Sequence, residues 1–98
     1  MPIQLAKTLQ TVDYTLYIIT DIDLPGSDRV LINQRIYQSK GHFDDDFLPI
    51  ILKRQVITNQ ARVNTIRMLI RTNYDEAINA VETFLTANVP YYQGGVVV

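Results

Sequence analysis

Apolar residues recur at helical spacing near the end of the chain. Seven positions fall on one face of a helix, and all but the last are apolar: Tyr74, Ala77, Ile78, Val81, Phe84, Leu85 and Asn88. Thr72 followed by Asp75 suits the start of this helix, and Asn88 followed by Pro90 suits its end. The pattern therefore predicts an amphipathic α-helix over residues 73–88 that lies on a hydrophobic surface.

Two stretches rich in β-branched and aromatic residues flank a turn signal in the first half of the chain. Residues 14–23 and 29–38 each predict a strand. Between them, Pro25 presets one turn position and Gly26 supplies the positive φ of the next. The sequence therefore predicts a β-hairpin. Its first strand is apolar on both faces, which is typical of a central strand.

The first twelve residues fit two patterns. Leu5, Leu9 and Val12 share a helical face, whereas Ile3 and Leu5 alternate like a strand. The helix is slightly favoured.

The middle of the chain gives a mixed signal. A short helix is expected over residues 47–54, because an aspartate precedes it and Pro49 fits its first turn. Over residues 55–71 a helix and a β-hairpin both fit the apolar spacing. The density of β-branched residues favours strands, near 55–58 and over 62–71.

These elements together predict an α+β fold. We expect a small antiparallel sheet of about four strands, with the helix at 73–88 packed on one face and a short helix near 47–54. Residues 1–90 are expected to form a single domain. Residues 91–98 are expected to be a C-terminal tail or an edge strand exchanged with a partner.

Composition limits the class of protein. In a chain of 98 residues, 47% hydrophobic and 19% charged residues indicate a folded domain rather than a disordered segment. No apolar run is long enough for a membrane span, and the N-terminus lacks the succession of a signal peptide, so a cytoplasmic protein is expected. The chain has no cysteine, which excludes disulfides and thiolate chemistry.

Side chains suited to catalysis are sparse. Asp21 and Asp23 follow an apolar strand, and His42 precedes the aspartates at 44–46, but a polar turn and a solvated loop account for both patterns. One histidine and no cysteine leave little material for a nucleophile and base pair. We therefore predict no cofactor, no metal site and no enzymatic activity.

The charges are segregated along the sequence, although the net charge is only −1. Residues 47–74 carry five basic residues and no acidic one, and the segments on either side are net acidic. This alternation suits a chain that neutralises itself on folding or pairs with copies of itself.

Three arginines of the basic segment form the candidate binding site. Arg67 and Arg71 are four residues apart and share a face in either a helix or a strand. With Arg62 they are expected to hold an anionic group through guanidinium forks. Tyr91 and Tyr92 are candidates to stack on a ligand ring.

The sequence favours a non-catalytic, homo-oligomeric binding or assembly protein, of the kind found as an accessory factor in bacteria or their viruses. The apolar central strand, the terminal valines and the alternating charge blocks all suit self-association. The alternative is binding or sequestration of an anionic ligand, a nucleotide or a nucleic-acid strand, through the arginine cluster. A pI near 5.6 makes nucleic acid the less favoured of these.

Overall fold

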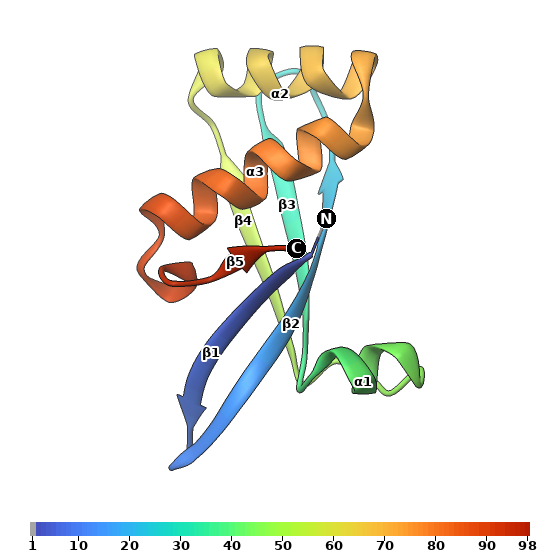
Figure 1. The fold of residues 1–98 in the computed structure, drawn as a ribbon. Helices are drawn as coiled ribbons and strands as arrows, with labels where there is room; N and C mark the ends of the chain where they lie inside the picture. Colours follow the sequence, from blue (N-terminus) through green and yellow to red (C-terminus); the bar gives the residue numbers. More distant parts are fainter. Residues whose placement is uncertain (1) are drawn as a thin grey trace.

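A five-stranded antiparallel sheet forms the centre of the α+β fold, as seen in a computed structural model that describes residues 2–98 (Figure 1). Its strands are β1 (Ile3–Leu9), β2 (Val12–Asp23), β3 (Val30–Tyr37), β4 (Ile51–Ile57) and β5 (Val96–Val97). The helices are α1 (Lys40–Asp44), α2 (Gln60–Thr72) and α3 (Tyr74–Asn88), followed by the 3-10 turn η1 (Pro90–Tyr92). The predicted fold class is confirmed.

The sheet is a meander whose strand order is β4-β3-β2-β1-β5. Ile18 of β2 pairs with Ile3 on one side and with Ile36 on the other, and Ile36 pairs in turn with Ile51. These four isoleucines form a row across one face, because directly paired residues point the same way. We call this the inner face of the sheet and the opposite one the outer face.

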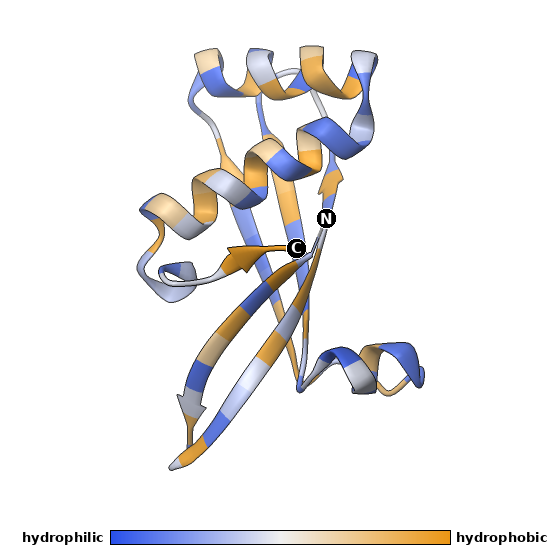
Figure 2. Ribbon diagram, in the orientation of Figure 1, coloured by the Kyte–Doolittle hydropathy of each residue, from blue (hydrophilic) through white to orange (hydrophobic). Residues whose placement is uncertain are grey.

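Helix α3 covers the inner face. Its buried residues Ala77, Ile78, Val81 and Leu85 belong to the same apolar cluster as the isoleucine row. Figure 2 shows hydrophobic and hydrophilic residues alternating along this helix and along the strands. The predicted amphipathic helix is thus confirmed within one residue at its start.

The cap of α3 differs from the expectation. Asn73, rather than Thr72, accepts hydrogen bonds from the backbone N–H groups of Asp75 (3.0 Å) and Glu76 (3.3 Å). Thr72 ends α2 instead, and its hydroxyl donates to the carbonyl oxygen of Met68 (3.1 Å). Since the N–H of Asn73 also donates to the carbonyl of Leu69 (2.7 Å), this one residue ends α2 and starts α3.

The strand predicted over residues 62–71 is wrong, because that segment is helix α2. Its start is capped by Asn59, whose side chain accepts from the N–H of Arg62 (3.2 Å). Val63 and Ile66 are buried at helical spacing in the core shared with α3. Tertiary packing therefore overrides the β-propensity of the branched residues.

The short helix expected over residues 47–54 is also wrong. Residues 51–57 form β4, which pairs along its length with β3. The short helix lies earlier, at α1, where Ser39 caps it by accepting from the N–H of His42 (3.2 Å). Only the strand expected near 55–58 overlaps β4.

The N-terminal helix was the wrong alternative as well, since residues 3–9 form β1. Two residues, Gln10 (φ 49°) and Thr11 (φ 66°), connect it to β2 with the paired positive φ values of a type I′ hairpin turn. Neither is the glycine or asparagine that usually signals this turn. The hairpin predicted from residues 14–38 is confirmed as β2 and β3, but Gly26 in its connection does not have the expected positive φ.

The C-terminal strand β5 pairs with β1 of its own chain, through Ile3 with Val97 and Gln4 with Val96. Exchange of this segment with a partner stays a prediction.

Three polar residues are buried between the sheet and α3. The hydroxyl of Thr20 donates to Oε2 of Glu82 (3.0 Å), and the side-chain amide of Gln34 donates to that hydroxyl oxygen (3.4 Å). Glu82 is fully buried. Burial raises its pKa from 4.5 to about 7, although the hydrogen bond from Thr20 acts in the opposite direction.

The free energy of unfolding is expected to fall as the pH rises from 4.5 to about 7. In this window the unfolded chain releases the proton of Glu82, while the folded chain retains it. Urea denaturation at about pH 5 and about pH 7.5 should show a loss of about 2 kcal/mol in wild type. Glu82→Gln should remove this slope. Glu76 is an exposed carboxylate of the same helix, and Glu76→Gln should keep the dependence of the unfolding free energy on pH. An equal dependence in all three proteins would contradict the assignment of this effect to Glu82.

Candidate functional site

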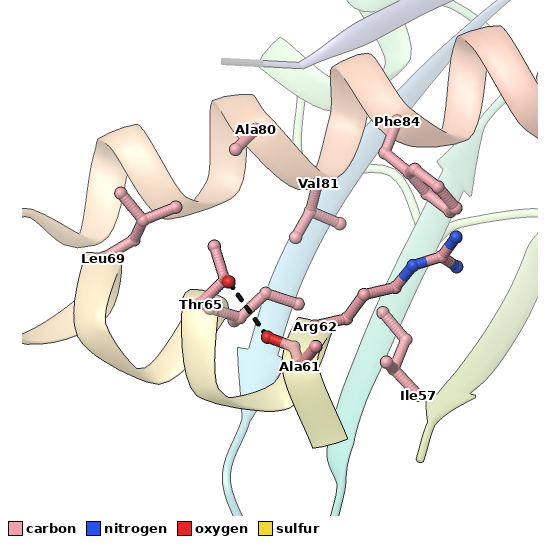
Figure 3. A pocket seen from close by; sticks show the side chains of 9 residues that line it. Ile57, Ala61, Arg62, Thr65, Leu69, Ala80, Val81 and Phe84 are labelled. Atoms are coloured by element: carbon pink, nitrogen blue, oxygen red, sulfur yellow. Dashed lines mark hydrogen bonds between the residues drawn. The ribbon is translucent and has the colours of Figure 1, made fainter. Parts of the chain in front are cut away.

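Helices α2 and α3 enclose a groove between them (Figure 3). Asn73 alone separates the two helices, so the chain reverses sharply and the helices lie side by side. The groove has a volume of about 270 Å³, and small residues such as Ala61 and Ala80 leave this space open. Its apolar lining includes Ile57, Ala61, Leu69, Ala80, Val81 and Phe84. We call it the helix groove.

The helix groove has one charged residue at its margin. Cζ of Arg62 lies 4.6 Å from the ring centroid of Phe84, a cation–π contact. The hydroxyl of Thr65 is already engaged, because it donates to the carbonyl oxygen of Ala61 (2.9 Å; dashed in Figure 3). The groove therefore offers an apolar floor and a guanidinium at one end.

The structure separates the three predicted arginines. Arg67 donates to the carbonyl oxygen of Gly26 (2.9 Å), which ties α2 to the β2–β3 turn. Arg71 follows four residues later on the same side of α2 and is exposed. At roughly 100° per helical residue, Arg62 lies on the opposite side from Arg71. Arg67 and Arg71 thus share a side as predicted, but Arg62 belongs to the helix groove.

The two predicted tyrosines have different environments. Tyr92 is fully buried in the core, and burial raises its pKa to about 12. Its ring is therefore not exposed for stacking on a ligand. Tyr91 packs edge-on against it, with ring centroids 5.0 Å apart, and is only half-buried.

Two lysines converge on the ring of Tyr91. The ammonium nitrogen of Lys7 lies 3.2 Å from the ring centroid and donates to the carbonyl oxygen of Tyr91 (3.1 Å). The ammonium nitrogen of Lys53 lies 3.8 Å from the same centroid. We call these three residues the lysine pair site. β2 and β3 separate β1 from β4 in the sheet order. Both lysines lie on the inner face of the sheet, so their long side chains reach the same ring.

The lysine pair site is a concentration of positive charge. Within residues 2–98, no carboxylate lies within ion-pair distance of either ammonium group. Burial, and then the charge of Lys53, lower the pKa of Lys7. The site is thus a candidate for anion binding. Sequence reasoning missed it because the lysines lie on strands distant in the sequence.

The acidic residues that resembled metal ligands have other partners. Asp21 pairs with Arg35 (3.6 Å), and a carboxylate oxygen of Asp23 accepts from the side-chain amide of Asn33 (2.6 Å). Nδ1 of His42 lies 2.8 Å from the hydroxyl oxygen of Ser39. In the part of the chain that the structure describes, no group of three or more acidic, histidine or cysteine residues could hold a metal ion.

Exposed apolar side chains concentrate between α1 and the end of β4. Leu48 is 87% exposed and Leu52 is 72% exposed. Phe47, Ile50 and Val56 are each about half exposed. β4 is also an edge strand, because β3 is its one sheet neighbour among the described residues. We call residues 47–56 the apolar segment.

Comparison of the chain with known protein families, curated proteins and solved structures finds no match. Within residues 2–98, no helix has the combined length and apolarity that crossing a membrane requires.

Proposed function

We propose that the protein is a non-catalytic assembly or binding protein that associates with copies of itself, in the manner of an accessory factor. The observation that supports this most directly is the apolar segment, which exposes large apolar side chains beside an open strand edge.

A single exposed leucine is ordinary on a protein surface, but a group of them is not. Leu52 and Val56 alternate along β4 and therefore point to the same outer face of the sheet. Phe47 and Leu48 continue the apolar segment just before the strand. Such a group is typical of a surface that a partner covers.

The open edge of β4 adds a second reason for association. An edge strand presents backbone N–H and C=O groups that another strand can pair with. The lysine and arginine at 53 and 54 make this edge basic, which reduces indiscriminate pairing of such strands. Specific association would then depend on complementary surfaces elsewhere on the chain.

Size-exclusion chromatography with light scattering should give a mass well above 11.2 kDa at high protein concentration. The mass should decrease on dilution, as mass action requires for reversible association. The double variant Phe47→Ser/Leu48→Ser should shift the transition to higher concentration, whereas Val12→Ser, an exposed apolar residue at the β1–β2 turn, should leave it unchanged. A mass of 11.2 kDa at every concentration would contradict the proposal.

A second candidate function is binding of an anionic ligand, such as a nucleotide. The lysine pair site favours it, because two partly buried ammonium groups meet there with no carboxylate within ion-pair distance in residues 2–98. The arginines of α2 are the other cationic surface, with Arg67 and Arg71 on one side.

Inorganic phosphate and ATP are the probes for this candidate. Each should raise the melting temperature of wild type above that in sodium chloride of equal ionic strength, since a ligand of the native state stabilises it. Lys53→Met should abolish the shift. Lys40→Met, which removes a lysine paired with Asp44 (2.9 Å), should retain it. Loss of the shift in Arg67→Ala/Arg71→Ala instead would assign the anion to α2, and no shift in wild type would exclude the candidate.

A further inference from the structure

We propose that Leu48 of one copy inserts into the helix groove of a second copy, so that the copies associate head to tail. This inference rests on the proposed self-association and identifies its two contacting surfaces.

The inserted element is a short projection formed by residues 44–48, which we call the acidic knob. The N–H groups of Asp46 and Phe47 donate to the carbonyl oxygens of Phe43 (3.2 Å) and His42 (3.0 Å). The ring of Phe47 packs against His42, with centroids 4.8 Å apart. Leu48 directly follows this hydrogen-bonded turn and is 87% exposed. A preformed projection loses less entropy on binding than a flexible one.

The helix groove has a matching size and polarity. Its volume of about 270 Å³ lies below the range of roughly 300–1,000 Å³ usual for drug-sized ligands, and it suits one or two apolar side chains. The groove walls lack a free hydroxyl or amide, because Thr65 is bonded to Ala61. A leucine side chain makes no hydrogen bonds and leaves no group of this groove unsatisfied.

The charges around the two surfaces are complementary. In the acidic knob Asp44 pairs with Lys40, whereas Asp45 and Asp46 form no ion pair among the described residues. α2 carries three arginines and no acidic residue, and Arg62 lies at the margin of the groove. Insertion of Leu48 brings the two aspartates toward Arg62, which favours this orientation of association.

α1, which leads into the acidic knob, and α2, which forms one wall of the helix groove, lie at opposite ends of the molecule (Figure 1). The knob precedes Ile51 at the start of β4, and the groove includes Ile57 at its end. They also lie on opposite faces of the sheet. α1 packs through Phe43 on Tyr17 of the outer face (5.2 Å between ring centroids), whereas α3 covers the inner face. A contact between two different surfaces is heterologous. Because the knob and the groove face away from each other, each added copy still presents one free surface, and the assembly can continue from copy to copy.

Cysteine cross-linking tests this contact directly, because the chain has no cysteine of its own. Leu48→Cys mixed with Ala80→Cys under mild oxidation should form a disulfide between the two variants, detected by mass spectrometry. Met68→Cys in place of Ala80→Cys is the matched control, since Met68 is an exposed residue of α2 outside the groove. It should give no such product above the level of random collision.

Complementation distinguishes a head-to-tail contact from a symmetric one. Leu48→Asp keeps an intact groove, and Ala80→Glu keeps an intact knob. Each variant alone should therefore be a monomer at concentrations where wild type associates. Their mixture should form a complex of two copies and nothing larger. Circular dichroism establishes that each variant is folded, and Ala61→Glu replaces Ala80→Glu if the latter is not.

The outcomes separate this inference from the proposed function. If wild type associates but no 48–80 disulfide forms, or if the two variants do not complement each other, the knob and groove contact is overturned and self-association stands. If wild type is a monomer at every concentration, both are overturned. A selective disulfide together with a two-copy complex supports both.

Discussion

Burial of the isoleucine row on the inner face is the interaction on which the rest of the structure depends. Full burial of each such side chain contributes roughly 1.5–3 kcal/mol. Strands alone cannot cover this face, so α3 lies across it and the C-terminal turn returns to place Tyr92 in the same cluster. The position of the helices is therefore set by the sheet. The helix groove and the lysine pair site exist because α2, α3 and the terminal segment meet around this row.

The sequence predicts the elements that carry local signals and fails for those that depend on contacts within the folded chain. The hairpin of β2 and β3 and the helix α3 carry their own local signals, a Pro-Gly turn and an apolar stripe with clear ends. α2 does not, because Val63, Ile66 and Ile70 fit one helical face while Ile66, Met68 and Ile70 alternate as in a strand. Only contact with α3 decides between the two. The sequence also fails to predict β1, because the turn that follows this strand carries no local signal. Its turn at Gln10 and Thr11 has the dihedral angles of a hairpin without the usual residues.

The candidate sites divide in the same way. Arg67 and Arg71 share a side because their spacing alone ensures it, and this much follows from sequence. The convergence of Lys7 and Lys53 on Tyr91 depends on how three separate elements, β1, β4 and η1, are arranged, and it has no local signature. The helix groove likewise arises from two alanines that become neighbours only after the helices pack. The lysine pair site and the helix groove are therefore made by tertiary structure and cannot be predicted from local sequence. The shared side of Arg67 and Arg71 can.

The double role of Asn73 has a consequence for the helix groove. One residue ends α2 through its N–H and begins α3 through its side chain, so the joint has no spare residue to act as a hinge. The two walls of the helix groove therefore meet at a joint of one residue. A substitution at Asn73 therefore removes the end of one helix and the start of the next together, and it would displace both walls of the helix groove at once.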